Sequence, residues 1–441
     1  MAATLNERGR VLRSSFILYC GLCFNYGVSM LFWILASRLD VASTGKALLI
    51  TALSYIFSFF SLFGIHYSIQ KRLSSGLREN PLPSAFAFTS IISALTALSV
   101  VIFFTPIELA FITVLSAIGY ERLRILDRVL LAYYDTVSIV VAYVISAITL
   151  ISSFIVLKYL VSPLYAMLLS QLFCQISLLV TFGYYAFKKV GNFPKTSKLY
   201  PYVCEGIYLW AFEFMFSSSY WLANFFAMFV SSSDELAGIG IILRISYIVY
   251  IFSATVAHVS LTGFARKKLK MDILQNAVLY TIPPSIILSM YVEDLLGVFS
   301  INASNLVLPS ILIFTSILFT PFVVIPQMRL FASGKAREAF IIGFSMAFSR
   351  IFSYILLGLR IGLVGIAFSH FLGSMISTII SSRYASFKTL LEPSFLKVMG
   401  LAIAISFFAY ILPFELGIFI LPAMLILLYV WKGYVVIPLP S

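Results

Sequence analysis

Apolar runs long enough to cross a lipid bilayer follow one another along the whole chain, and this feature limits the fold more than any other. An ideal helix rises 1.5 Å per residue, so a hydrocarbon core of about 30 Å needs roughly 20 residues. Such runs occupy 14–37, 47–70, 83–105, 107–126, 133–157, 161–187, 205–230, 236–262, 273–292, 304–328, 337–359, 361–382, 395–412 and 416–434. The sequence therefore predicts an all-α polytopic membrane protein with about fourteen transmembrane helices.

The composition excludes a large domain outside the membrane. Hydrophobic residues make up 61% of the chain and charged residues only 11%, whereas soluble domains carry about 25% charged residues. Because the apolar excess is spread over all 441 residues, we expect short loops and no separate catalytic domain.

The basic residues predict the orientation, because lysine and arginine accumulate on the cytoplasmic side of membrane proteins. With the N-terminus inside, 24 of the 30 basic residues fall on the inner side, among them Arg122, Arg124 and Arg128 at the inner end of the fourth run. Arg38, Lys46, Lys158 and Arg360 fall outside, and Arg244 and Arg350 lie within spans. We therefore expect a multi-pass protein of the cytoplasmic membrane with both termini cytoplasmic. The net charge of +13 then reflects orientation and contact with anionic membrane lipids, and not binding to nucleic acid.

An internal repeat divides the chain. The pattern S-Y-I-x4-S-x4-H-x-S begins at Ser54 and again at Ser246, which gives six identities in fifteen positions at an offset of 192. A second match, Ser170 to Lys189 against Ser369 to Lys388, has an offset of 199. Six helices per repeat is an even number, so both halves insert with the same orientation and the repeat is parallel. We expect one six-helix bundle over 1–190, a second over 191–390 and two additional helices over 391–441, with a central cavity between the bundles.

Four short motifs along the chain resemble those of one transporter family. Ala36-Ser37-Arg38-Leu39 is followed by Gly45, Ala237-Gly238 leads to Arg244, Ala332-Ser333-Gly334-Lys335 precedes the eleventh run, and 362–367 reads G-x-x-G-x-A. In this order they resemble the prokaryotic polysaccharide transporters, or lipid-linked oligosaccharide flippases, of the multidrug/oligosaccharidyl-lipid/polysaccharide exporter superfamily. The resemblance implies a flippase that moves an isoprenoid-phosphate-linked oligosaccharide across the membrane by alternating access. Asn224 stands where many relatives carry an acidic residue, so the resemblance does not imply whether transport by this protein is coupled to an ion.

Polar residues within the spans are the candidate substrate-binding residues, because a charge at mid-bilayer costs about 2.5–3.5 kcal/mol on insertion scales. Arginine suits a phosphate, since its planar fork can donate two parallel hydrogen bonds. The candidates for the cavity are Arg244, Arg350, Glu213, His370, Asn224, Asn25, His66 and His258. Glu213 is an alternative partner for either arginine in a structural ion pair. His66 and His258 are equally well explained as interfacial histidines, and His370 as a helix-packing residue.

Other classes of function lack their expected signals. The chain has no phosphate-binding G-x-x-x-x-G-K-[ST] loop, no His/Cys/Asp/Glu cluster with metal-ligand spacing and no long outer loop for a catalytic site. We expect no cofactor, no metal, no enzymatic activity and a monomer. One alternative is a small-molecule or drug antiporter of the same superfamily. Such antiporters usually carry an acidic coupling residue in the first half, and the absence of a membrane-embedded Asp or Glu from the first six spans argues against this alternative. A second alternative is a non-transporting membrane glycan polymerase.

Overall fold

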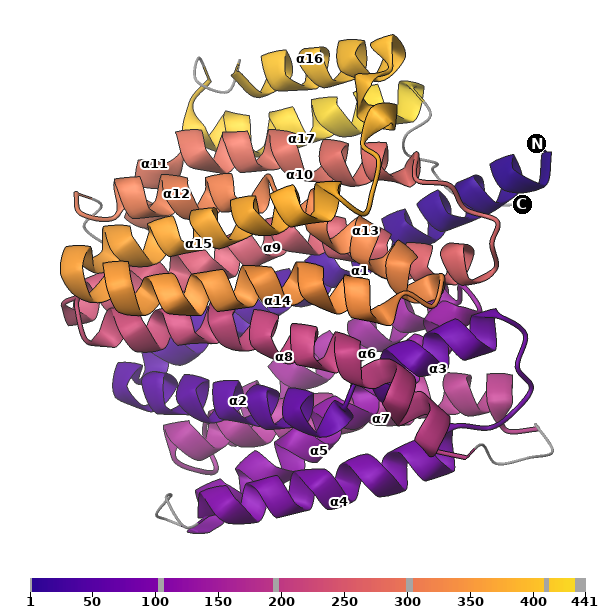
Figure 1. Ribbon diagram of the computed structural model, residues 1–441. Helices are drawn as coiled ribbons and strands as arrows, with labels where there is room; N and C mark the ends of the chain where they lie inside the picture. The colour runs from indigo at the N-terminus through magenta and orange to yellow at the C-terminus, as the bar shows by residue number, and fades with distance from the viewer. Residues whose placement is uncertain (1, 102–106, 193–197, 299–303, 408–411, 433–441) are drawn as a thin grey trace. The chain divides into compact units, whose positions relative to one another are not determined.

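The computed structural model describes residues 2–101, 107–192, 198–298, 304–407 and 412–432. These residues are almost entirely helical (Figure 1). The chain splits into two compact units, of which one holds Ile17–Phe214 and the other holds Met1–Phe16 with Met215–Ser441. We call them the N-unit and the C-unit, and describe each by itself. The boundaries between the two units lie inside two helices, and the division into two six-helix repeats near residue 190 stays a prediction.

The helices that build the N-unit come from the first half of the chain. The first and the last of them, α1 and α8, each continue into the C-unit. The helices are α1 (Ala2–Leu39), α2 (Val41–Leu62), α3 (Ile65–Ser74), α4 (Leu82–Val101), α5 (Ile107–Ala132), α6 (Thr136–Leu157), α7 (Pro163–Val190) and α8 (Tyr200–Met228).

The helices of the C-unit include two short turns of other types. A π-helical turn, Tyr354–Gly358, joins α14 to α15, and a 3₁₀ turn, Lys388–Leu391, precedes α16. The helices are α9 (Ser233–Ala265), α10 (Ile273–Met290), α11 (Val292–Val298), α12 (Val307–Ile317), α13 (Thr320–Ala332), α14 (Ala336–Ser353), α15 (Leu359–Ser382), α16 (Pro393–Phe407) and α17 (Phe414–Trp431).

Every predicted span coincides with a helix or a broken pair of helices in the described ranges. The runs 47–70 and 304–328 each contain one break, between α2 and α3 and between α12 and α13, while α11 is a short extra helix. Within the part of the chain that the structure describes, seven segments are long and apolar enough by themselves to cross a membrane: Glu7–Ala36, Thr136–Leu157, Pro163–Val190, Gly238–Ala265, Ile273–Met290, Val307–Ala332 and Ala336–Ser382. The last contains two predicted spans, α14 and α15. The predicted all-α polytopic fold is confirmed.

Two turns support the repeat. The turn after α5 has a left-handed residue at Tyr134 (φ 58°), and the turn after α13 has one at Gly334 (φ 84°), an offset of 200. In both turns the next residue donates its N–H to the carbonyl five residues earlier, over 3.0 and 2.9 Å. The ends of α3 and α9 match in the same way, with left-handed residues at Gly76 and Lys267. The small-x-G-K motif that ends at Lys335 is therefore a tight helix–helix turn.

The C-terminal helix α17 packs on α10 within the C-unit. Helix α10 continues through Pro283-Pro284, although a proline in a helix leaves the carbonyl four residues earlier without its usual donor. For Pro283 that carbonyl belongs to Leu279, and the hydroxyl of Tyr429 on α17 donates to it over 2.8 Å. A side chain from the last helix therefore satisfies a backbone group that the proline leaves open.

Candidate functional site

A buried polar cluster lies between α14 and α15 in the C-unit. The guanidinium Nη2 of Arg350 donates to Ser374 Oγ over 2.7 Å, and the Arg350 side chain is 4% exposed. The hydroxyl of Tyr354 lies 2.7 Å from Nε2 of His370, and both residues are buried. We call Arg350, Tyr354, His370 and Ser374 the Arg350 cluster.

The local backbone explains how these residues meet. Tyr354 opens the π-helical turn, and π-helical turns re-aim side chains within a helix and are frequent at functional sites. The chain then bends at Ile361 and Gly362, where Gly362 has a φ of 62°. This bend corresponds to the G-x-x-G-x-A motif of the sequence and directs α15 back along α14. Gly373 provides the space for the arginine, because a Cβ there would lie 2.5 Å from Arg350 Cγ.

The other predicted site residues are dispersed. Arg244 is exposed on α9, and Asn25 is half-buried on α1 in the N-unit. Glu213 and Asn224 lie on α8, but their side chains are outside the part of the chain that the structure describes. Of the eight candidates, Arg350 and His370 come together in one cluster.

The two histidines of the repeat have different surroundings. His66 is buried on α3, just past the break at Phe63 and Gly64, and its ring packs against Tyr67 with centroids 4.2 Å apart. His258 is half-buried within the continuous helix α9. The break in the first half is absent at the matching point of α9, so the shared S-Y-I-x4-S-x4-H-x-S pattern does not give the two histidines the same environment.

A second buried cluster, in the N-unit, contains an acidic residue that the sequence pattern did not indicate as a site residue. Glu121 on α5 is fully buried. Its Oε2 accepts from Ser93 on α4 over 2.6 Å and from Ser61 on α2 over 2.8 Å. The two serine oxygens are themselves 2.9 Å apart. We call Glu121, Ser61 and Ser93 the Glu121 cluster.

Glu121 corrects two statements made from the sequence. The fourth span was expected to end at residue 126, with Arg122, Arg124 and Arg128 in the inner loop, but α5 continues to Ala132. Glu121 precedes the end of that helix by eleven residues, which is about 16 Å along the axis. It therefore lies well inside the helix, and the claim that the first six spans hold no embedded acidic residue is wrong. The charges of this run resemble the start of a loop in sequence, whereas the protein buries Glu121 and Arg128 and half-buries Arg122 and Arg124.

The arginines of α5 are also engaged within the N-unit. Arg122 donates to Ser90 Oγ over 3.2 Å, and Ser90 in turn lies 3.4 Å from Glu121 Oε1. Arg128 is 1% exposed, donates to Gln70 Oε1 over 3.3 Å and lies 4.5 Å from the centroid of the Tyr67 ring. The sequence placed only Arg244 and Arg350 well within spans. Arg122 and Arg128 on α5 show that further basic residues lie within the long helices.

The two clusters can do different chemistry. The guanidinium of the Arg350 cluster suits a phosphate or another anion. The carboxyl group of the Glu121 cluster can accept hydrogen bonds when ionised or donate one when protonated, so it suits a proton or a cation. Among the described residues no group of three or more His, Cys, Asp or Glu side chains could hold a metal ion.

Comparison with known proteins identifies the fold. No protein-family model and no curated protein matches the chain. A MATE transporter of Vibrio cholerae is similar in structure, with a TM-score of 0.68 at 13% identity over 90% of this chain and 100% of that one. A MATE transporter in a straight conformation matches with a TM-score of 0.67 at 14% identity over 87% of this chain and 96% of that one. A MOP superfamily transporter from Pyrococcus furiosus, whose binding pocket is described as reversed in polarity, gives 0.63 at 12% identity over 86% and 95%. The chain therefore has the fold of MATE transporters.

Proposed function

We propose that the protein is a flippase that carries a lipid-linked oligosaccharide across the cytoplasmic membrane by alternating access. The buried guanidinium of Arg350 is the observation that carries the proposal. A phosphate that links a glycan to an isoprenoid lipid cannot cross hydrocarbon without compensation of its charge. A guanidinium inside the protein supplies that compensation, and its fork geometry fits phosphate oxygens.

The surroundings of Arg350 favour a polar ligand. Ser374, Tyr354 and His370 place two hydroxyls and an imidazole on the same pair of helices, and these groups can hydrogen-bond sugar or phosphate oxygens. The lipid tail would remain in the bilayer while the headgroup passes through the protein. We expect a monomer, surrounded by membrane lipids, with both termini cytoplasmic and its basic loops against the anionic inner leaflet.

The test is a flipping assay in liposomes that contain the purified protein and a fluorescent polyprenyl-diphosphate disaccharide. An impermeant reagent that destroys the fluorophore on the outer leaflet measures how fast the inner pool becomes accessible. We expect wild-type protein to accelerate flipping and Arg350→Ala to slow it at least tenfold. Arg383→Ala removes an exposed arginine after α15 and should leave the rate unchanged. Wild-type protein that does not accelerate flipping would overturn the proposal.

A small-molecule antiporter is the second candidate function, and the Glu121 cluster favours it. The absence of an embedded acidic residue was the reason to set this function aside, and Glu121 removes that reason. An antiporter of this kind exchanges its substrate for an ion that a buried carboxyl group can hold. In everted vesicles with an imposed pH gradient, proton-driven uptake of ethidium that Glu121→Gln abolishes and Glu108→Gln preserves would support this function over the flippase.

A further inference from the structure

Two helices begin in one compact unit and end in the other. Helix α1 is part of the C-unit as far as Phe16 and part of the N-unit from Ile17 onward. Helix α8 is part of the N-unit as far as Phe214 and part of the C-unit from Met215 onward. Because α1 and α8 are the first helices of the two repeats, the start of each repeat lies among helices of the other repeat.

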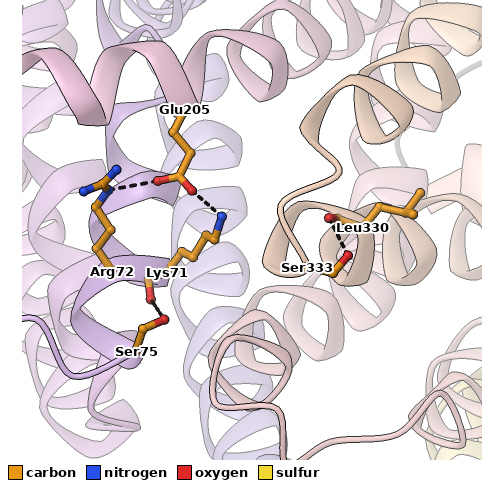
Figure 2. A network of polar contacts seen from close by, with 6 residues as sticks. All are labelled: Lys71, Arg72, Ser75, Glu205, Leu330 and Ser333. Carbon is orange, nitrogen blue, oxygen red and sulfur yellow. Dashed lines mark hydrogen bonds and ion pairs between the residues drawn. The ribbon is translucent and has the colours of Figure 1, made fainter.

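The start of α8 is held on the end of α3 by one carboxylate between two cations. In Figure 2, Glu205 reaches from α8 toward Lys71 and Arg72. The Lys71 ammonium contacts Glu205 Oε1, and Arg72 Nε lies 2.9 Å from Oε2. The three side chains are 15%, 32% and 20% exposed for Lys71, Arg72 and Glu205. All three side chains keep some contact with solvent, so water can hydrate their charges if the pairs separate, which limits the cost of breaking them.

Uncharged contacts fix where α8 crosses the break between α2 and α3. Gly64 has a φ of 68°, and a Cβ at this position would lie 2.0 Å from the carbonyl oxygen of Gly206. One turn further, Trp210 Nε1 donates to the carbonyls of Phe59 and Phe60, over 3.1 and 3.0 Å. These carbonyls lie in the last turn of α2, where the break removes their helical partners.

The start of α1 is held on the end of α9 in the same way. Glu7 Oε1 lies 3.8 Å from Arg266, the residue that follows the last turn of α9. Arg8 on the next position lies 3.2 Å from Asp272, which precedes α10. Glu7 is largely buried, with its side chain 6% exposed.

The two sets of ion pairs occupy corresponding positions in the internal repeat. Helices α1 and α8 are the first in each repeat, and α2–α3 and α9 are the second. The ends of α3 and α9 already match through their left-handed turns at Gly76 and Lys267. In each case a glutamate from the first helix of one repeat meets a cation at the end of the second helix of the other. Unrelated surface ion pairs would have no reason to follow this relationship.

We propose that Glu205 with Lys71 and Arg72, and Glu7 with Arg266, are paired locks that hold the starts of α8 and α1 on the opposite repeat. Both locks release together when the protein opens at the end that carries its basic loops. A continuous helix that starts in one unit and ends in the other must either bend or detach at its start when the units change their arrangement. If the contacts at its start hold, the helix bends, and if they break, its start detaches. The idea of such a cycle rests on the proposed transport function, but the locks are tested without any substrate.

The test measures hydrogen–deuterium exchange by mass spectrometry on the protein in lipid nanodiscs. Glu205→Lys places a cation against two cations, and we expect exchange over 200–210 to rise at least fivefold. Because the locks release together, exchange over 7–16 at the start of α1 should rise by a comparable factor. The triple variant Glu205→Lys, Lys71→Glu, Arg72→Glu reverses all the charges and should restore slow exchange in both segments. Glu108→Lys, an equal change of charge at the exposed start of α5, should leave both segments as in the wild type.

Two outcomes would overturn the proposal. If Glu205→Lys changes exchange over 200–210 but not over 7–16, the two contacts are independent. If the charge-reversed triple variant still exchanges rapidly, the effect comes from lost packing and not from the ion pairs. The milder Glu205→Gln keeps the shape of the side chain and serves if Glu205→Lys does not fold, with a smaller rise expected in both segments. Failure of the flippase assay would change none of these outcomes.

Discussion

The hydroxyl of Ser93 donates to the carboxyl group of Glu121 over 2.6 Å and joins α4 to α5 inside the N-unit. Ser61 reaches the same oxygen from α2, two positions before the break that leads to α3. Ser61 also has the carbonyls of Phe57 and Ser58 within 3.1 and 3.0 Å. Its hydroxyl can therefore turn to the backbone when the carboxyl group is protonated, so the cluster can hold either form of Glu121.

The first prediction concerns the stability that this cluster provides. Glu121→Ala removes the buried carboxylate that Ser61 and Ser93 share and leaves a gap between α2, α4 and α5, so we expect it to lower the free energy of unfolding by about 1–3 kcal/mol. Glu121→Gln keeps an accepting oxygen of the same shape and should cost less. Glu108→Ala, at the exposed start of the same helix, should change the stability by less than about 0.5 kcal/mol. Thermal unfolding of the four proteins in one detergent measures this, and an Ala variant as stable as wild type would contradict it.

The second prediction concerns the bond between α17 and α10. Tyr429→Phe removes the donor to the Leu279 carbonyl, and we expect a loss of about 1–3 kcal/mol because that carbonyl stays buried. Pro283→Ala restores a backbone N–H four residues after Leu279, which can bond this carbonyl within the helix.

A double-mutant cycle tests that explanation. In the Pro283→Ala background Tyr429→Phe should cost clearly less than in the wild type, since the carbonyl then has a second donor. Tyr384→Phe, on an exposed tyrosine, serves as the control. Equal costs in both backgrounds would show that the tyrosine acts through packing alone.

The helices were predictable because the length of an apolar run is a property of the sequence alone. The breaks within them were not. The interruption at Phe63 and Gly64 depends on the close approach of Gly206, about 140 residues away along the chain, which no local pattern signals. The repeat predicted that α2 and α9 would correspond, but only α2 is broken at this point.

The candidate site was predictable by residue type and not by contact. Arg350 and His370 were expected to matter because polar groups within spans need partners, but their meeting depends on the bend at Gly362. For Glu121 the residue type was misleading, because its charged neighbours suggested a loop. Five charged residues within the eight positions 121–128 resemble the end of a span in sequence, and only the packing of α2 and α4 on α5 shows that the first of them is buried.

The third prediction distinguishes the charge of Arg350 from its shape. Arg350→Lys keeps the positive charge but not the planar fork. If the guanidinium binds phosphate through two hydrogen bonds, Lys should flip the fluorescent polyprenyl-diphosphate disaccharide several-fold more slowly than wild type, and Ala more slowly again. Membrane levels of both variants should stay near those of the wild type. Loss of the protein from the membrane in both variants would instead indicate a structural role.

The fourth prediction concerns pH and the turn between α5 and α6. Asp135 caps α6 by accepting from the Ser138 N–H over 3.4 Å, and it pairs with Lys189 of α7 at 2.9 Å. Burial raises the pKa of Asp135, but the hydrogen bonds from Lys189 and Ser138 outweigh it and leave this pKa below its usual value. A carboxyl group with a lowered pKa stabilises the folded state above the pKa of the unfolded chain, about 3.9, and loses this effect as the pH falls through the lower folded value.

The substitution Asp135→Asn isolates the ion pair, because asparagine caps a helix about as well as aspartate. We expect it to reduce the free energy of unfolding by less than about 1 kcal/mol at pH 7, since the pair is partly exposed. The deficit should be constant down to about pH 5 and should shrink below about pH 4, where the carboxyl group is protonated first in the unfolded chain and, at lower pH, in the folded protein. Asp135→Ala also removes the cap, so part of its larger deficit should persist at low pH. Thermal unfolding at intervals of one pH unit measures both curves, and an Asn deficit that grows as the pH falls would show that Asp135 does not hold this charge in the folded protein.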